Sequence, residues 1–258
     1  MSNPHGTPIW YELLTPDPDA SKAFYDAVIG WTIEPRSSGD HMEYRMIDTG
    51  DGHVGGVAGI AEGVTPPGMK PGWKFYLGVD DVDRTAAAIR DAGGSVAIAP
   101  FDLSDIGRMA LVADPQGVPF YVMRGVSEDS STAWDRTGMG KCNWNELSTS
   151  DQAAAQDFYA RVFGWTYPDK MPMGAMGDYV FIHAAGETIG ATMPARADGS
   201  PPAWTFYFRA PDIEAAADKV KAGGGTVHHG PVEVPGGDRI ILARDPHGAA
   251  FGVVGPGR

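Results

Sequence analysis

The stretch AFYDAVIGW, residues 23–31, decides the fold because it returns as DFYARVFGW at residues 157–165, 134 positions further along the chain. Other segments recur in the same order along both halves. Such ordered self-similarity indicates a duplicated module. The other recurring pairs are Trp-x-Glu at 10–12 and 144–146, WKFYLGVDDVD (73–83) and WTFYFRAPDIE (204–214), and GRMALVADPQG (107–117) and DRIILARDPHG (238–248).

The length of the chain suits two domains of ordinary size, since it has 258 residues. The stretch between the two copies is polar and contains glycine, as domain boundaries usually do. We therefore predict a first module at residues 1–124, a linker at residues 125–140 and a second module at residues 141–258.

The composition excludes several classes of partner. Twenty Lys and Arg against 33 Asp and Glu give a net charge of −13, which opposes the phosphate neutralisation that nucleic-acid binding requires. The N-terminus lacks the features of a signal peptide, and no apolar run reaches the roughly 20 residues that span a bilayer. Cys142 is the only cysteine, so no intrachain disulfide forms. We expect a cytoplasmic protein with no nucleic-acid or membrane partner.

The hydrophobic pattern of each half alternates between strand and helix periods. In the first strand Trp10 and Glu12 fall on one face, because side chains alternate along a strand. Asp17 should cap the first helix, which Gly30 ends, and Asp81 should cap the second. Three short strands follow each helix, so each half is β-α-β-β-β written twice. The other strands expected in the first half lie near residues 31–34, 42–49, 54–60, 73–79, 96, 109–113 and 120–123.

This order of elements, with FY…GW on the first helix and DP-x-G before the last strand, resembles the vicinal oxygen chelate superfamily. That superfamily includes glyoxalase I, extradiol dioxygenases and bleomycin-resistance proteins. The stretch FDLSDIGRMALVADPQG, residues 101–117, is similar to two-module bacterial members of glyoxalase-like or hydroxylase type. The resemblance implies an α+β fold in which four βαβββ units form two modules with cup-shaped mixed sheets.

In the metal enzymes of this superfamily, histidine and glutamate on the first and last strands of each unit bind one divalent ion, which keeps positions open for substrate oxygens. The matching positions here hold groups that do not usually ligate such ions. They are Trp10 and Trp144 on the first strands, Lys74 and Thr205 on the strands that enter the second units, and Tyr121 and Gly252 on the last strands. We predict no cofactor, with a divalent metal as the alternative.

Glu12 and Glu146 share a strand face with the tryptophan two residues earlier, one pleat repeat away. In one interpretation each carboxylate is a general base or an anchor for a ligand. In the other it is a buried carboxylate that pairs with Arg108 or Arg239, because a buried charge needs a partner. The sequence leaves both interpretations open.

The remaining candidates are aromatic, cationic or hydroxylic. Lys74 could pair with an anionic substrate or be an exposed, solubilising lysine, and its counterpart Thr205 indicates that the two cups differ. Trp73 and Trp204 are more typical of a core. The residues proposed to bind the ligand are Trp10, Lys74, Tyr76, Arg108, Tyr121, Trp144, Thr205, Tyr207 and Arg239. The aromatic members of this set could hold a flat or cationic ligand by stacking.

Three functions follow from these patterns. The first is metal-independent binding of a small organic molecule, as in bleomycin-resistance proteins. The second is a glyoxalase-like lyase or a dioxygenase or hydroxylase-type enzyme with an unrecognised divalent metal site. The third is a metal-free enzyme in which Glu12 or Glu146 is the general base. In each case the partner is a small-molecule ligand, and the chain is a monomeric pseudodimer or a homodimer.

Overall fold

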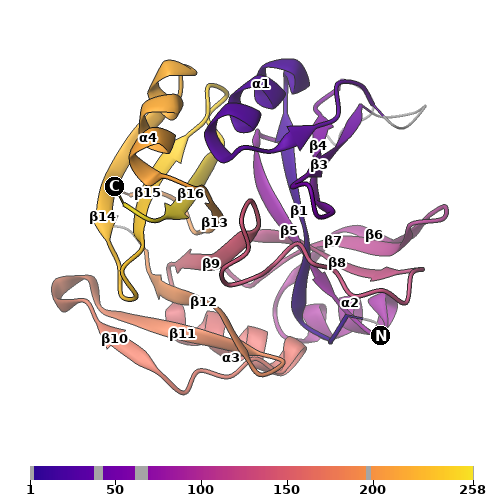
Figure 1. Cartoon of the computed structure of the whole chain (residues 1–258). Coiled ribbons are helices and arrows are strands. Elements are labelled where there is room, and N and C mark those ends of the chain that lie inside the picture. The colour runs from indigo at the N-terminus through magenta and orange to yellow at the C-terminus, as the bar shows by residue number, and fades with distance from the viewer. Residues whose placement is uncertain (1–2, 38–42, 62–68, 196–198, 258) are drawn as a thin grey trace. The chain divides into compact units, whose positions relative to one another are not determined.

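The computed structural model describes residues 3–37, 43–61, 69–195 and 199–257, and within them the chain forms four βαβββ units (Figure 1). Met42, at which we expected a strand to begin, lies outside these residues. The elements are β1 (Thr7–Thr15), α1 (Pro18–Ile29), β2 (Thr32–Ile33), β3 (Tyr44–Asp48) and β4 (His53–Gly59) in the first unit; β5 (Gly72–Gly78), α2 (Val82–Asp91), β6 (Ser95–Leu103), β7 (Gly107–Ala113) and β8 (Pro119–Gly125) in the second; β9 (Cys142–Thr149), α3 (Gln152–Phe163), β10 (Lys170–Pro172), the 3-10 turn η1 (Gly174–Met176), β11 (Asp178–Ala184) and β12 (Glu187–Pro194) in the third; and β13 (Ala203–Arg209), α4 (Ile213–Ala222), β14 (Thr226–Glu233), β15 (Arg239–Arg244) and β16 (Ala250–Gly255) in the fourth.

Each of the four helices begins after an aspartate. The carboxylate of Asp17 accepts a hydrogen bond from the backbone N–H of Ala20 at 2.9 Å, and Asp81 caps α2 in the same way. These bonds satisfy amides that the first helical turn leaves without a partner. Gly30 ends α1 with φ of 91°, a left-handed conformation that glycine adopts without strain. The predicted caps and the predicted end of α1 are confirmed.

The strands form two eight-stranded mixed sheets, in the orders β2-β3-β4-β1-β5-β8-β7-β6 and β10-β11-β12-β9-β13-β16-β15-β14. In every βαβββ unit the first strand pairs in parallel with the last strand. The register places Glu12 of β1 opposite Gly56 of β4, and Glu146 of β9 opposite Ala191 of β12. The α+β fold that the resemblance implied is therefore confirmed.

The chain packs into two compact units, and each unit combines segments from both halves of the sequence. We call Met1–Ile9, Lys74–Ser131 and Trp144–Trp204 the inner unit, which holds most of the second and third βαβββ units. We call Trp10–Trp73, Thr132–Asn143 and Thr205–Arg258 the outer unit, in which α1 of the first βαβββ unit lies beside α4 of the fourth (Figure 1). The module boundaries predicted from the repeats stay a prediction.

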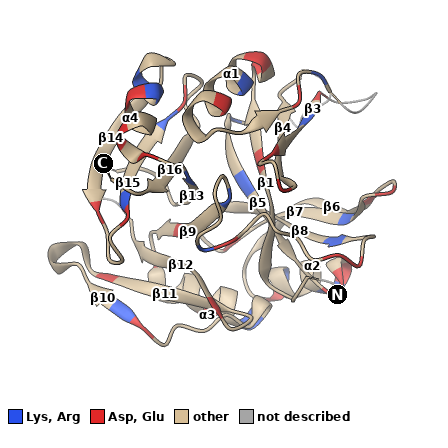
Figure 2. Cartoon of the chain, viewed as in Figure 1, with Lys and Arg blue, Asp and Glu red and all other residues tan. Residues whose placement is uncertain are grey.

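Charged residues are distributed along the elements of both units, as Figure 2 shows. Basic and acidic positions are interspersed along the described elements, which agrees with acidity as a property of the chain in general. Among the described residues, no helix is both long enough and apolar enough to cross a membrane. The cytoplasmic location stays a prediction.

The core of the inner unit is built around Tyr159 of α3. The indole N–H of Trp204 donates to the Tyr159 hydroxyl at 3.1 Å, and that hydroxyl donates to the carboxylate of Asp114 at 3.2 Å. The Tyr159 ring also stacks on Trp165, with 4.7 Å between ring centroids. All four side chains are buried. We call Trp204, Tyr159 and Asp114 the sealed relay of the inner unit.

The outer unit repeats this arrangement around Tyr25 of α1. Trp73 donates to the Tyr25 hydroxyl at 2.9 Å, and Tyr25 donates to Asp245 at 3.1 Å. Burial raises the pKa of Tyr25 well above its usual value, as it does for its counterpart in the inner unit, so both phenols keep the proton that they donate. The FY, W-x-F-Y and DP-x-G motifs therefore recur because each supplies one member of a sealed relay, and the assignment of Trp73 to the core is confirmed.

Candidate functional site

The candidate site of the inner unit is centred on Trp144 and Glu146 of β9. Tyr179 of β11 connects these two side chains. The indole N–H of Trp144 donates to the Tyr179 hydroxyl at 2.7 Å, and that hydroxyl donates to Oε2 of Glu146 at 2.8 Å. Trp144 and Tyr179 are half-buried, whereas Glu146 is only 6% exposed. We call these three residues the open relay.

The aromatic ring of Phe181 lies beside the open relay. The strand register places Phe181 of β11 opposite Ala191 of β12, which in turn lies opposite Glu146, so the three residues form one row across three strands. The ring of half-buried Phe181 packs edge-on against Trp144, with 6.0 Å between centroids. This face therefore combines a half-exposed aromatic platform with a buried carboxylate, an arrangement that can hold a flat organic ring.

The outer unit repeats part of this arrangement with Trp10 and Glu12 of β1. The indole N–H of Trp10 donates to the hydroxyl of Tyr44 on β3 at 2.8 Å. The Tyr44 ring lies over Gly56, where an added Cβ would come within 2.2 Å of it, and Gly56 is opposite Glu12 in the sheet. Glu12 is 5% exposed. The same three residue types thus occur on both faces, but Ala191 replaces the glycine in the inner unit.

The sequence analysis missed Tyr44 and Tyr179, which tie both tryptophans to their faces. A signal for them was present in the sequence. The segment EYRMI at residues 43–47 returns as DYVFI at residues 178–182, with the tyrosine and the isoleucine at the same positions. The chain separation of 34 to 35 residues between each tryptophan and its tyrosine hides the pairing until the strand order is known.

The other predicted aromatic residues of the inner unit form a second group. Tyr76 of β5 stacks on Tyr121 of β8, with 4.3 Å between centroids and 11° between the ring planes. Both rings are buried, and half-buried Lys74 lies two residues before Tyr76 on the same face of the strand. In the outer unit the equivalent Tyr207 lies over Gly252 instead, and Thr205 is buried beside it on β13.

Arg108 and Arg239 pair with acidic side chains of the helices that cover their sheets, and these contacts give no support to the expectation that they bind a ligand. Arg108 on β7 pairs with Asp83 of α2 at 2.6 Å and with Asp102 at 3.0 Å. Arg239 on β15 pairs with Glu214 of α4. Arg108 alternates with Met109 along the strand, so the two side chains point to opposite faces. The arginines join helix to sheet, and the pairing of Glu12 or Glu146 with them stays a prediction.

The donor chemistry at these faces does not fit the divalent metal that the resemblance implies. The indoles of Trp10 and Trp144 have no lone pair to offer, and each donates its N–H to a tyrosine. Glu146 already accepts from Tyr179. Within the described ranges, no three His, Cys, Asp or Glu side chains gather where they could hold an ion. The expectation that no cofactor is needed stays a prediction.

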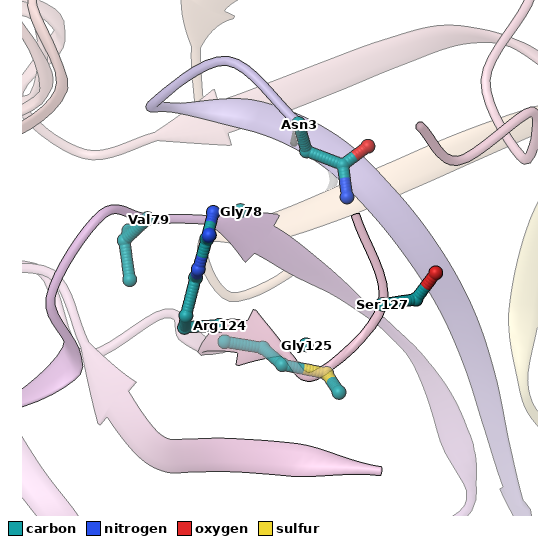
Figure 3. Close-up of a pocket in the computed structure, with 7 residues that line it drawn as sticks. Asn3, Gly78, Val79, Arg124, Gly125 and Ser127 are labelled. Atoms are coloured by element: carbon teal, nitrogen blue, oxygen red, sulfur yellow. The ribbon is translucent and has the colours of Figure 1, made fainter. Parts of the chain in front are cut away.

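Two hollows lie elsewhere in the described structure. One, in the inner unit at the ends of β5 and β8, has a volume of about 10 Å³, roughly the space of one water (Figure 3). The other is a largely apolar groove between α1 and α4 of the outer unit. Neither contains a predicted site residue. The first is lined by Asn3, Gly78, Val79, Met123, Arg124, Gly125 and Ser127, the second by Ala20, Ala23, Phe24, Ala27, Lys219, Ala222, Gly223 and Pro246.

Two bacterial proteins are similar in sequence to this chain over nearly its whole length. CFP32 of Mycobacterium tuberculosis, whose name marks it provisionally as a glyoxylase, is 34% identical over 252 residues, which cover 97% of this chain and 95% of that protein. The anthracycline biosynthesis protein DauV of Streptomyces sp. strain C5 is 33% identical over 268 residues, with coverage of 96% and 93%.

A solved structure shares the fold. The Mn(II)-bound glyoxalase from Novosphingobium aromaticivorans aligns with a TM-score of 0.65 at 19% identity, covering 99% of this chain and 83% of that one. The family model for the Glyoxalase/Bleomycin resistance protein/Dioxygenase superfamily matches residues 8–122 and 141–253. Together with the repeated βαβββ units, these matches show that the chain belongs to this superfamily.

Proposed function

We propose that this protein binds a flat, aromatic small organic molecule on the tryptophan-bearing faces of its sheets, without a metal ion. The observation that carries the proposal is the open relay, in which a half-exposed tryptophan is fixed by a tyrosine beside a buried carboxylate. A platform held in place by hydrogen bonds loses little conformational freedom when a ring stacks on it.

The relatives support a fused-ring ligand. DauV is named for anthracycline biosynthesis, and anthracyclines contain fused planar rings. Such rings can stack on the half-exposed indole of Trp144, and aromatic pairs gain stabilisation beyond the apolar area that they bury. We therefore place the ligand of this chain in the same chemical class.

Titration of the purified full chain with 1,8-dihydroxyanthraquinone, followed by calorimetry, tests the proposal. Trp144→Ala should weaken binding by roughly tenfold, which corresponds to about 1.4 kcal/mol. Trp134→Ala is the matched control, because Trp134 is also half-buried and lies outside both relays. Equal binding by the wild type and Trp144→Ala contradicts the proposal.

The enzymatic alternative depends on the same carboxylate. Glu146 is buried and bonded to a phenol, as a general base needs to be positioned. Metal analysis of protein purified without chelators separates the alternatives. A stoichiometric divalent ion that disappears in Glu146→Gln would overturn metal-free binding, and turnover of the bound ligand by metal-free protein would favour the general base.

A further inference from the structure

The end of the β6–β7 hairpin in the inner unit carries a patch of exposed apolar side chains. Ile106 in the turn is 55% exposed, and Val126, directly after β8, is 64% exposed. Backbone hydrogen bonds hold this patch together, because Ile106 N–H donates to the carbonyl of Leu103 and Val126 N–H donates to that of Ile106. The hairpin ends in the edge strand of its sheet (Figure 1). We call the patch the apolar tip, and its members are Phe101, Leu103, Ile106 and Val126.

The repeat shows that the hairpin can fold without these large apolar side chains. The β14–β15 hairpin of the outer unit has the same register, since Val232 lies opposite Ile240 as Phe101 lies opposite Met109. At the four positions of the apolar tip this hairpin carries smaller residues, namely Val232, Val234, Gly237 and Gly257. A patch of exposed apolar side chains that folding does not require indicates a contact with another molecule.

The groove between α1 and α4 of the outer unit is the complementary feature. Its volume is about 540 Å³, which gives room for several apolar side chains. Three of the alanines that line it are exposed, and the inner unit has charged residues at the equivalent positions. The alanines are Ala23, Ala27 and Ala222, and their counterparts are Asp157, Arg161 and Asp91. The outer unit therefore keeps an apolar surface where its own repeat has side chains suited to water.

The charges beside the tip and the groove have opposite signs. Lys219 of α4 is the charged residue that lines the groove, and it is exposed. Asp105 lies in the turn of the hairpin, next to Ile106, and is exposed as well. An apolar tip with an aspartate thus matches an apolar groove with a lysine, and such complementarity favours one mode of docking over others.

We infer that the chain binds a second copy of itself by inserting the apolar tip of one copy into the groove between α1 and α4 of the other. Ile106 then packs on the alanines of the groove, and Asp105 pairs with Lys219. The contact joins two different surfaces, so it is heterologous. Removal of exposed apolar groups from water stabilises it. The contact does not involve the tryptophan-bearing faces, so it is independent of the proposed function.

Sedimentation velocity of the purified full chain, from about 1 μM to about 1 mM, tests this inference. The wild type should associate as the concentration rises. Ile106→Lys at the tip and Ala27→Arg in the groove should each weaken association by roughly tenfold or more, because each places a bulky cation in the contact. Ala27→Arg introduces the residue that α3 carries at the equivalent position, so the helix can accommodate it.

A mixture of the two variants distinguishes this contact from other modes of association. The Ala27→Arg copy keeps its apolar tip and the Ile106→Lys copy keeps its groove, so the mixture should associate more strongly than either variant alone. Val232→Lys on β14 and Arg161→Ala on α3 are the matched controls at the equivalent positions of the repeat, and both should associate as the wild type does.

The inference is overturned if the wild type stays monomeric up to about 1 mM. It is also overturned if either variant associates as the wild type does, or if the mixture is no stronger than its components. Circular dichroism verifies that each variant is folded. If Ala27→Arg is not folded, a charge exchange replaces it: Asp105→Lys and Lys219→Asp should each weaken association, and the double variant should restore it. Failure of the double variant to recover would contradict the pairing of tip and groove.

Discussion

The sealed relay and the open relay of the inner unit use the same three chemical groups in different surroundings. Each connects an indole N–H to a phenol and the phenol to a carboxylate. Around Tyr159 all three members are buried among packed rings, whereas around Tyr179 the indole and the phenol are half-exposed. Hydrogen bonds that water cannot replace stabilise the fold, and those at a half-open face hold a surface ready for a ligand.

The largest expected effect comes from removing the hydroxyl of the sealed relay. Tyr159→Phe leaves the Trp204 N–H and one oxygen of Asp114 buried without this partner, so we expect a loss of about 2–4 kcal/mol in the free energy of unfolding. Tyr179→Phe should cost less than about 1.5 kcal/mol, because Trp144 is half-buried and water can replace the hydroxyl at its N–H. Urea unfolding at neutral pH measures both losses. Equal losses would contradict the idea that the two relays differ in their contribution to stability.

The next largest effect compares the sheet face that carries Trp10 with the sheet face that carries Trp144. In Gly56→Ala the new methyl group would collide with the ring of Tyr44, so the ring must move away from Trp10. We expect a destabilisation of about 1–3 kcal/mol, typical of overpacking, and a shift in tryptophan fluorescence. Ala191→Gly, at the matching position of the inner unit, is the control and should change the fluorescence little. If Gly56→Ala changes neither the stability nor the tryptophan fluorescence, the close approach at this glycine does not fix the ring of Tyr44.

A smaller effect is the pH dependence of the free energy of unfolding. Burial raises the pKa of Asp114 above its ordinary value of 3.8. The folded chain therefore holds this proton more tightly than the unfolded chain, so the contribution of Asp114 to stability falls as the pH rises from 3.8 through the raised pKa. In Asp114→Asn the side-chain oxygen can still accept from the two backbone amides of the turn.

Urea unfolding from pH 4 to pH 7 checks this linkage. The stability of the wild type minus that of Asp114→Asn should decrease as the pH rises, whatever the other carboxylates do, because they titrate in both proteins. A difference that stays constant or increases over this range would show that burial does not dominate the pKa of Asp114.

The smallest effect should come from Arg108. Its pairs with Asp83 and Asp102 are largely exposed, and exposed ion pairs contribute little to stability. Arg108→Ala should leave the affinity for 1,8-dihydroxyanthraquinone unchanged and shift the urea midpoint only slightly. A marked loss of affinity would return Arg108 to the ligand-binding set.

Local signals in the sequence were sufficient to predict much of the fold. The aspartate before each helix, the glycine after α1 and the period-two alternation of β1 act through neighbouring residues, so a single sequence reveals them. β6 is longer than the segment near residue 96 indicated, because exposed residues occupy much of this edge strand and weaken its pattern.

The site was predicted less completely because its bonds join distant strands. Alternation placed Trp144 and Glu146 on one face, but only the strand order brings Tyr179 between them. Alternation also separates Arg108 from Met109, yet it does not say which face α2 covers. In the structure α2 covers the face that carries Arg108, and it places Asp83 beside this arginine.

The pairing of early and late segments in the outer unit bears on how this chain is synthesised. Tyr25 and its carboxylate partner Asp245 are 220 residues apart, so a ribosome must add all of the intervening residues before the first helix can bury its aromatic side. Contacts of such long range slow folding and leave apolar surface exposed in the meantime. We expect the nascent chain to depend on chaperones until its last strands emerge, whereas the inner unit can assemble as soon as residues up to Trp204 are available.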